Sequence, residues 1–287
     1  METVRKIFER RRQISSAVRS LESIPALTGE SESLRIVSDE DLAMIFNSPQ
    51  IQQEWNDSQA ALKQACPIED GKTDGVNPGD RRAVWYLIKG FRPSSVLEIG
   101  TNVGASTTHI ASALQSLARQ DASIIPRLVT LDVQDVNGVS GFWKQRGLDA
   151  SPRDRIESIG CGDFVSFVTE NSLRYFDRCK DEFDFIFLDG DHSAAAVYQE
   201  IPRALSVLKK DGIILLHDYF PRNRPIWSNG SLVAGPYTGA ARLISEGVPI
   251  KVIPLGELPW PTKLGSSYTS LALVTREPAN LRNSESR

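Results

Sequence analysis

The chain has 287 residues, of which 40% are hydrophobic and 24% charged, and its formal net charge is −3. This length can bury one sizeable core with appended segments, and the composition is ordinary for a globular protein. The small net charge gives no electrostatic support for a nucleic-acid partner. No apolar stretch is long enough to span a bilayer, and the first residues lack the apolar core of a secretory signal. We therefore expect a cytoplasmic protein with neither nucleic-acid nor membrane partners.

The first seventy residues predict helices without visible chemistry. Apolar residues recur at helical spacing over residues 1–27, among several arginines. Ser38 and Asp41 resemble a capping box that opens a second, short helix, and a third helix is expected near residues 52–65. We interpret residues 1–70 as a helical extension that forms either a lid or a homodimer contact.

Strand and helix patterns alternate from residue 71 onward. Helices are expected near residues 81–89, 108–119, 164–175, 194–209 and 239–246. Strands are expected from Val96 and near residues 128–132, 156–159, 183–188, 212–217, 251–255 and 270–275. Each parallel crossover needs a covering helix, so the alternation predicts an α/β fold with a doubly wound, mostly parallel seven-stranded sheet. The last two strands have only a loop between them, which predicts one antiparallel strand. Residues 71–276 then form the main domain, and residues 277–287 form a mobile polar tail.

A buried strand that runs into a glycine turn occupies residues 96–107, Val-Leu-Glu-Ile-Gly-Thr-Asn-Val-Gly-Ala-Ser-Thr. Gly100 and Gly104 allow tight backbone geometry and close approach of a ligand, and the next helix offers free N–H groups at its N-terminus. A turn that binds phosphate needs positive charge at its edge, whereas Glu98 carries a negative charge there. The turn therefore favours a ligand with hydroxyls, an amine or a positive centre. A strand-turn-helix joint that binds nothing is the alternative.

Acidic residues end the neighbouring strands, where ligands of parallel sheets bind. Asp132 ends the second strand and is placed to accept hydrogen bonds from the two hydroxyls of a ribose, although a loop or capping aspartate is the alternative. Gly162 and Asp163 follow the expected third strand, where the family resemblance of these motifs implies that an adenine would lie. Asp163 could also cap the helix expected to follow it.

The most specific stretch is the apolar strand at residues 183–188, which ends in Asp-Gly-Asp-His at residues 189–192. The next strand ends in a similar way, with His-Asp-Tyr at residues 217–219. Mainly oxygen ligands favour Mg²⁺, Ca²⁺ or Mn²⁺ over Zn²⁺. The candidate metal ligands are Asp189, Asp218 and His217. A metal-free polar cluster is the alternative. The third histidine, His109, is interpreted as a packing or surface residue.

The long loop at residues 220–237 could have either a binding or a structural role. Arg222 and Arg224 could meet an anionic substrate or be solvated, and the aromatic residues of this loop could wall a substrate site or anchor the loop. The cysteines form no CxxC pair, which predicts free thiols. They are Cys66, Cys161 and Cys179.

These motifs resemble those of the class I S-adenosylmethionine-dependent methyltransferases. Glu-x-Gly-x-x-x-Gly at residues 98–104 resembles their motif I. The two acid and histidine motifs are similar to those of bacterial small-molecule O-methyltransferases related to catechol O-methyltransferase, and to the macrocin and novobiocin sugar O-methyltransferases. The loop at residues 75–80 resembles the loop that covers S-adenosylmethionine in catechol O-methyltransferase. The likeness covers about residues 75–275.

The resemblance implies an enzyme that transfers a methyl group from S-adenosylmethionine to a hydroxyl of a phenolic, sugar or natural-product acceptor, assisted by a divalent cation such as Mg²⁺. Asp189 and Asp218 match metal ligands of catechol O-methyltransferase, but Tyr219 stands in place of an asparagine. In the sugar enzymes an aspartate stands where this chain has His217. The third ligand is therefore open.

The resemblance also implies roles in proton transfer and cofactor binding. Asp191 matches the general base of the sugar enzymes, and His192 is an adjacent candidate. The residues implied to contact the cofactor are Asn77, Gly79, Glu98, Gly100, Thr101, Asn102, Gly104, Ser106, Thr107, Asp132, Gly162, Asp163 and Asp189.

Three alternative functions share these motifs. One is a metal-independent N-methyltransferase with the same cofactor. Another is a hydroxylase- or hydrolase-like metalloenzyme that uses the Asp/His cluster without the cofactor. The last is a catalytically silent binding protein on the same fold.

Overall fold

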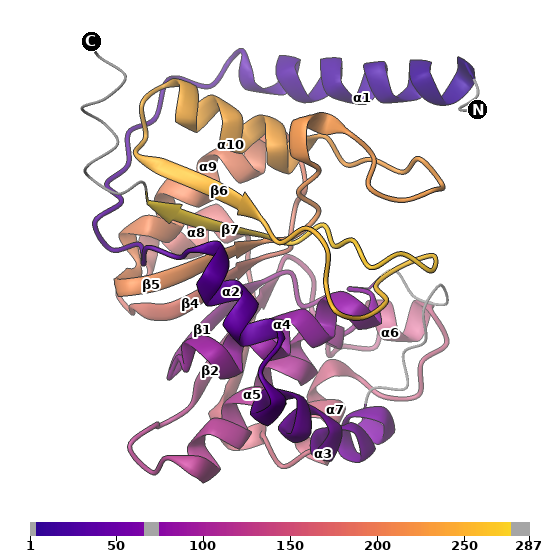
Figure 1. Cartoon of the computed structure of the whole chain (residues 1–287), viewed down its shortest axis with the longest axis vertical. Coiled ribbons are helices and arrows are strands. Elements are labelled where there is room, and N and C mark those ends of the chain that lie inside the picture. The colour runs from indigo at the N-terminus through magenta and orange to yellow at the C-terminus, as the bar shows by residue number, and fades with distance from the viewer. Residues whose placement is uncertain (1–3, 66–74, 277–287) are drawn as a thin grey trace. The chain divides into compact units, whose positions relative to one another are not determined.

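The computed structural model describes residues 4–65 and 75–276. The chain divides into two compact units. Figure 1 shows the chain with most of its helices and strands labelled. Unit 1 comprises Met1–Ser38, Phe176–Gly256 and Ser270–Arg287, and unit 2 comprises Asp39–Tyr175 and Glu257–Thr269. The predicted extension contributes residues to both units, and the predicted domain boundaries at residues 70 and 276 stay a prediction. The predicted tail lies outside the described residues.

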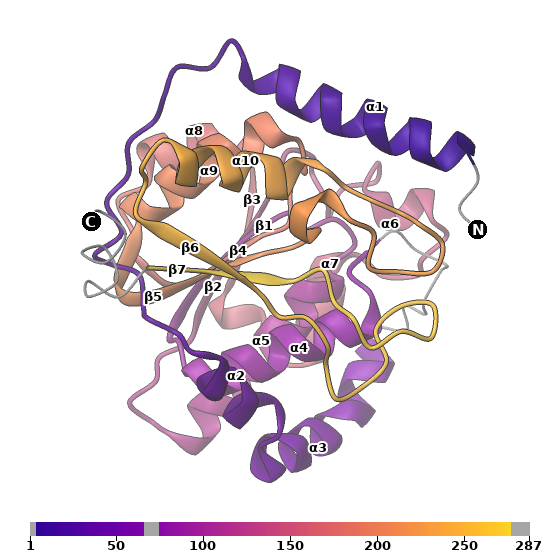
Figure 2. The ribbon, with the colours of Figure 1, turned by 45° about the horizontal axis from the view of Figure 1, so that its top comes forward.

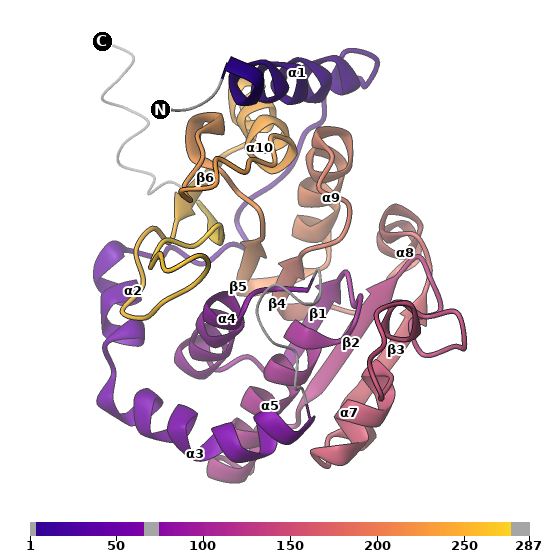
Figure 3. The ribbon, with the colours of Figure 1, turned by 90° about the vertical axis from the view of Figure 1, so that its right-hand side faces the viewer.

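Unit 2 contains three parallel strands in the order β3-β2-β1. Its elements are α2 (Asp39–Phe46), α3 (Pro49–Ala65), α4 (Pro78–Phe91), β1 (Ser95–Ile99), α5 (Ala105–Gln120), β2 (Arg127–Asp132), α6 (Phe142–Gln145), α7 (Pro152–Ser158), η1 (Gly162–Phe164) and β3 (Val165–Thr169). Every residue of β1 and the four central residues of β2 are buried, as expected of parallel strands covered on both faces. Figure 3 shows α4 and α5 beside β1 and β2, with α3 outside them. Helix α8 (Ser172–Arg178) continues the chain from unit 2 into unit 1.

Unit 1 contains four strands in the order β4-β5-β7-β6. Its elements are α1 (Val4–Leu21), β4 (Phe183–Leu188), α9 (Ala194–Ser206), β5 (Leu208–Leu216), η2 (Pro221–Asn223), α10 (Gly235–Ser245), β6 (Ile250–Pro254) and β7 (Ala272–Arg276). Strands β4 and β5 are parallel, whereas β7 is antiparallel to both β5 and β6. Helix α1 lies over α9 and α10 (Figure 2), and most of its side chains are exposed.

The predicted fold class is confirmed. The seven strands form a mostly parallel sheet with helices, one strand is antiparallel, and a helix stands at the N-terminus. No helix within the described ranges combines the length and the apolar character that a membrane crossing requires.

Two predicted elements between the second and fourth strands are wrong. The strand expected at residues 156–159 is helix α7, and the helix expected at residues 164–175 begins instead with strand β3. Helix α7 forms because Ser151 and Asp154 make a reciprocal capping box and Pro152 occupies the first turn, where its missing N–H costs nothing.

Candidate functional site

Glu98, near the end of β1, is fully buried and holds the glycine turn from inside. Its Oε2 accepts hydrogen bonds from the Thr107 hydroxyl at 2.5 Å and from the Thr130 hydroxyl at 2.7 Å. The Thr101 and Thr130 hydroxyls lie 2.6 Å apart. One carboxylate thus joins β1, β2 and the first turn of α5. Hydrogen bonds to a charged group contribute about 1.5–3 kcal/mol each, so Glu98 fixes the shape of the turn. Its direct contact with a cofactor stays a prediction.

Asp132 braces the same turn from the carboxyl end of β2. Its Oδ2 accepts a hydrogen bond from the Asn102 N–H at 2.9 Å, and its Oδ1 accepts one from the Gln134 N–H at 3.0 Å. Each carboxylate oxygen can accept a second hydrogen bond, and Asp132 is only half-buried. Asp132 can therefore order the turn and still accept hydrogen bonds from ligand hydroxyls. Sequence reasoning found the residue but missed its bond to Asn102.

Two glycines give the turn its path. Gly100 and Gly104 have φ values of 100° and 77°, in the left-handed region that other residues rarely adopt. The Gly100 N–H donates to the Leu131 carbonyl at 2.7 Å. A Cβ on Gly104 would lie 2.8 Å from Pro152 Cβ, so a side chain there would displace α7. Both glycines are required by the conformation itself.

Only some of the turn residues that were predicted to contact the cofactor are accessible to a ligand. Gly100, Asn102 and Asp132 are half-buried and can meet a ligand. The other predicted side chains on β1, the turn and the first turn of α5 are at most 2% exposed, so a ligand could reach these residues only through the main chain. These buried residues are Glu98, Thr101, Ser106 and Thr107.

The segment at residues 75–77 lies against the glycine turn. A Cβ on Gly75 would lie 3.2 Å from Val103 Cγ2 and 3.3 Å from Ala105 Cβ. Asn77 caps α4, because its Oδ1 accepts a hydrogen bond from the Asp80 N–H at 3.0 Å. This placement fits the resemblance to a loop that covers a cofactor. Residues 66–74, which precede this segment, lie outside the described residues.

Gly79 is explained by close packing. A Cβ on this residue would lie 2.4 Å from both the Pro261 carbonyl oxygen and Thr262 Cα. The Gly79 carbonyl accepts a hydrogen bond from the Trp260 indole at 3.0 Å. The contact between Gly79 and a cofactor stays a prediction.

Gly162 and Asp163 lie at the opposite end of β3 from the one predicted. They form η1, which precedes β3, because the strand thought to end before them is helix α7. Ligands of parallel sheets bind at the carboxyl ends of the strands, so the reason for placing adenine there is wrong. The residue after β3 is Glu170, whose N–H donates to the Asp132 carbonyl at 2.8 Å. Sequence reasoning missed Glu170, although the capping box of α7 would have shifted the strand and revealed it.

In unit 1, two imidazoles and two carboxylates gather where β4 and β5 end. His217 Nδ1 lies 2.8 Å from Asp189 Oδ1 and 3.7 Å from Asp218 Oδ1. His192 Nε2 lies 3.6 Å from Asp218 Oδ2 and 3.9 Å from Asp189 Oδ1. The His192 side chain is 33% exposed, against 11% for His217 and Asp189. These four residues form the acid–histidine cluster, and His192 is its most accessible member.

Backbone strain accompanies the cluster. Asp218 has a φ of 51°, which is uncommon for a residue other than glycine. The Tyr219 N–H donates to the Ser270 carbonyl at 2.8 Å, and the Ser270 hydroxyl donates to Asp218 Oδ1 at 3.3 Å. Strained residues that surrounding bonds hold in place concentrate at functional sites. The geometry of Asp218 is consistent with such a site.

Asp191 is exposed and shapes the start of α9. Its Oδ1 accepts a hydrogen bond from the Ser193 N–H at 2.8 Å, and the Ser193 hydroxyl in turn accepts one from the Ala196 N–H. These bonds are those of a helix cap. Of the two predicted general bases, His192 lies within the cluster.

The predicted metal ligands do not form a metal site as they stand. Across residues 4–65 and 75–276, no group of three or more His, Cys, Asp or Glu residues is arranged to hold a metal ion. The His217 ring nitrogen faces Asp189 and Asp218 at 2.8 and 3.7 Å. An imidazole thus stands close to the two carboxylates, where a cation would have to bind.

His109 on α5 is a packing residue, as interpreted from the sequence. It is buried, its Nδ1 lies 2.8 Å from the Ala105 carbonyl, and its ring centroid lies 5.9 Å from that of Trp55. Burial, with a smaller effect of the Arg81 cation, lowers the pKa of His109 to about 3. The thiols of Cys161 and Cys179 are free, and Cys66 lies outside the described residues.

Known proteins share sequence and structural features with this chain. Residues 97–219 match the family model described as a methyltransferase domain. This span contains the glycine turn, Asp132 and the acid–histidine cluster. A search of curated proteins gives no match.

Several solved structures share the fold at low sequence identity. The O-methyltransferase TomG from Streptomyces achromogenes, solved in complex with SAM, is 16% identical with a TM-score of 0.50, over 94% of this chain and 99% of that one. An O-methyltransferase from Bacillus cereus, solved in complex with SAH, is 19% identical with a TM-score of 0.50, over 93% and 100%. The chain therefore has the class I methyltransferase fold, as its motifs predicted, and its residues 97–219 are similar to a methyltransferase domain.

Proposed function

We propose that this protein is an S-adenosylmethionine-dependent O-methyltransferase that acts on a hydroxyl group of a small molecule. The observation that supports the cofactor most directly is the half-buried Asp132, which braces the glycine turn through Asn102 and keeps lone pairs for ligand hydroxyls. TomG and the Bacillus cereus enzyme were solved with SAM and SAH, the two forms of this cofactor. The proposal assigns cofactor binding to Gly100, Asn102 and Asp132.

Proton removal is the step for which the protein must supply a base. S-adenosylmethionine, when bound, supplies a methyl group that is already activated. A phenol has a pKa of about 10 and a carboxylate one of about 4, a mismatch of about six units or about 8 kcal/mol. An imidazole, with an ordinary pKa of about 6.5, narrows this gap to about 5 kcal/mol. A histidine is therefore the better base for a hydroxyl acceptor.

We assign the base to His192 within the acid–histidine cluster. Its Nε2 is accessible and lies 3.6 Å from Asp218 and 3.9 Å from Asp189. Two nearby carboxylates stabilise the imidazolium that forms when the ring takes the acceptor proton. His217, 2.8 Å from Asp189, orients that carboxylate. Asp191, the other candidate, is exposed and engaged in capping α9.

Assistance by Mg²⁺, Ca²⁺ or Mn²⁺ stays a prediction. The described residues do not present a formed three-ligand site, and we derive no step through a metal. Turnover measured in excess EDTA, with and without added Mg²⁺, tests the prediction. Unchanged turnover in EDTA would contradict it.

The experiment that tests the proposal is calorimetric titration of the purified protein with S-adenosylmethionine and S-adenosylhomocysteine. This is followed by transfer of an isotopically labelled methyl group to a panel of phenolic and sugar acceptors. We expect both cofactor forms to bind and label to appear on acceptor oxygen. Absence of cofactor binding would exclude every methyltransferase function, and label on nitrogen alone would favour the N-methyltransferase.

Association through the N-terminal helices is the remaining part of the proposal. Helix α1 has 18 residues, and Phe8 and Val18 on it are 65% and 48% exposed. A second copy of the chain would bury such apolar side chains. Light scattering on the protein with and without residues 1–21 tests the homodimer, and a monomer in both cases would contradict it. The cytoplasmic location also stays a prediction.

A further inference from the structure

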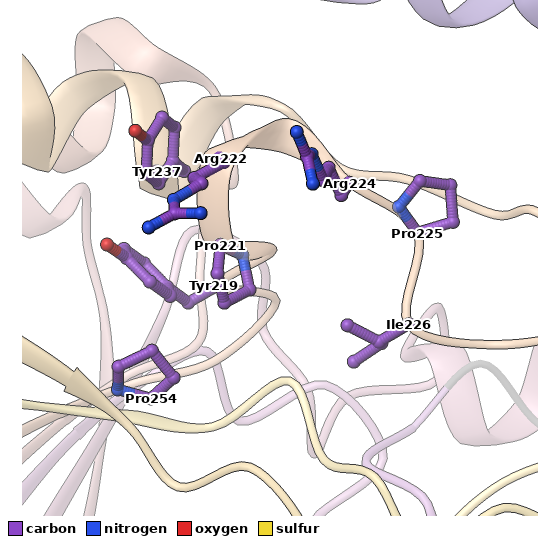
Figure 4. Close-up of a pocket in the computed structure, with 8 residues that line it drawn as sticks. All are labelled: Tyr219, Pro221, Arg222, Arg224, Pro225, Ile226, Tyr237 and Pro254. Carbon is purple, nitrogen blue, oxygen red and sulfur yellow. The ribbon is translucent and has the colours of Figure 1, made fainter.

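A pocket of about 500 Å³ opens in unit 1 beside the loop that follows β5 (Figure 4). Tyr219, one of its lining residues, directly follows Asp218 of the acid–histidine cluster in the chain. Its apolar walls are Pro221, Pro225, Ile226 and Pro254. The volume lies within the range of small-molecule sites, and rigid proline walls suit a flat ligand.

Two tyrosines bring hydroxyl groups to this pocket. The ring centroids of Tyr219 and Tyr237 lie 5.7 Å apart, with 57° between the ring planes. A phenol hydroxyl has one O–H donor, so each tyrosine can donate a hydrogen bond to a ligand in the pocket.

Two arginines add positive charge on the same loop. Both Arg222 and Arg224 are exposed, line the pocket and, within the part of the chain that the structure describes, form no ion pair. Figure 4 shows the Arg222 guanidinium directed to the same side as the phenol oxygens of Tyr219 and Tyr237. Donors from three side chains thus converge at one end of an otherwise apolar pocket.

The backbone holds Arg222 in a strained conformation. Arg222 and Asn223 have φ values of 56° and 53°, both in the left-handed region. The Asn223 N–H donates to the Phe220 carbonyl at 2.9 Å, and the Asn223 side-chain amide donates to the Thr238 hydroxyl at 3.1 Å. Two successive residues of this kind persist only when surrounding bonds hold them. The turn therefore presents Arg222 in a fixed position.

We propose that this pocket binds the methyl acceptor through a carboxylate, and that the substrate class is hydroxylated aromatic acids. The inference rests on the proposed function, because it names the acceptor of that reaction. The Arg222 guanidinium matches a carboxylate in two parallel hydrogen bonds, and the tyrosine hydroxyls can complete its acceptor capacity. The proline and isoleucine walls accommodate the ring. A phosphorylated acceptor shares the negative charge but has a tetrahedral head group and needs no flat apolar wall.

Binding measurements on the full chain with S-adenosylhomocysteine present test this proposal. The probes are 3,4-dihydroxybenzoate, uncharged catechol and inorganic phosphate. We expect the acid to bind at least tenfold more tightly than catechol, and phosphate to compete only weakly. Arg222→Gln should remove this preference, and Arg222→Lys should restore part of it. Arg174→Gln, which changes an exposed arginine outside the pocket, serves as the matched control.

The outcomes separate this proposal from the proposed function. Equal binding of the acid and catechol, or equal losses in Arg222→Gln and the control, would overturn the pocket assignment while cofactor binding stood. Phosphate competition as strong as that of the acid would overturn the carboxylate class. Arg222-dependent binding of the acid without any cofactor binding would support the pocket and contradict the methyltransferase. In turnover, Arg222→Gln should raise KM at least tenfold and change kcat less than twofold.

Discussion

The glycine turn and the acid–histidine cluster both place two carboxylates near the ends of buried parallel strands, but their charges have different partners. Glu98 and Asp132 accept hydrogen bonds from hydroxyl and backbone N–H groups, which do not titrate near neutral pH. Asp189 and Asp218 instead face imidazoles, which can accept and donate protons in catalysis. The difference indicates a turn whose shape is fixed by hydrogen bonds, and a cluster suited to proton transfer. Substitutions in the turn should alter the affinity for S-adenosylmethionine and the stability of the fold. Substitutions in the cluster should alter the rate of methyl transfer.

The largest expected effect follows from His192→Gln. Loss of a positioned base lowers turnover by about 10²- to 10⁴-fold. Affinity for S-adenosylmethionine should stay within twofold, because the residues proposed to bind the cofactor lie in the glycine turn. Asp191→Asn is the matched control and should lower kcat less than tenfold, since Asp191 is exposed and caps α9. Steady-state kinetics with calorimetry on both variants gives the comparison. The reverse order of effects would move the base to Asp191.

A smaller effect is expected from Asp132→Asn in the glycine turn. The variant replaces one carboxylate oxygen by an NH₂ group, which cannot accept a hydrogen bond, so the N–H of either Asn102 or Gln134 loses its acceptor. A hydrogen bond to a charged group contributes about 1.5–3 kcal/mol. The affinity for S-adenosylmethionine should fall about 10- to 100-fold, as calorimetry would show. At saturating cofactor, kcat should be nearly unchanged. A large fall in kcat would mean that the glycine turn also affects the rate of methyl transfer.

Local patterns were enough to predict much of the fold and part of the candidate site. Strand β4 has the residues expected of it, because an unbroken apolar run bounded by polar residues has few alternatives. The end of that strand and of β5 supplied the acid–histidine cluster. The glycine turn was found because its conformation requires glycine at two fixed positions. In each case the decisive signal lies within about ten residues.

Features that depend on distant partners could not be predicted in the same way. The sequence does not show that Asp132 bonds to Asn102, or that Thr130 points at Glu98, because each pair is set by strand register. The wrong predictions of a strand in place of α7 and of a helix in place of β3 have another cause. The apolar residues before Gly160 fit a short strand, and only the capping box at Ser151 identifies a helix. Short apolar segments are ambiguous by periodicity alone, so the capping signal should have decided.

The buried His109 of unit 2 predicts that the free energy of unfolding depends on pH. Burial is the main cause of the low pKa of His109, about 3 in the folded protein against about 6.5 unfolded. Between these values the unfolded chain binds more protons. The resulting stability is complete above about pH 6.5 and is lost as the pH falls toward 3, by at most about 1.4 kcal/mol per pH unit.

His109→Phe should therefore reduce the acid dependence of the free energy of unfolding. Phenylalanine fills a similar space beside Trp55 and does not titrate. Urea unfolding of both proteins at several pH values between 3.5 and 7 measures the slopes. Parallel slopes would show that other groups dominate the acid response, and would contradict the low pKa.

The smallest effect is expected at Arg242, which ties the end of α1 to α10. Its guanidinium donates to the Leu21 and Ile24 carbonyls at 2.5 and 2.6 Å and pairs with Glu246 at 2.7 Å. The Arg242 side chain is 22% exposed, so solvent weakens these interactions and Arg242→Gln should cost only about 1 kcal/mol. The loss should be local, because few side chains of α1 are buried. Trypsin should then cleave at the exposed Arg11 earlier than in the parent protein, while kcat is unchanged if α1 serves only association. A fall in kcat together with early cleavage would instead assign the N-terminal helix to the reaction, as a lid.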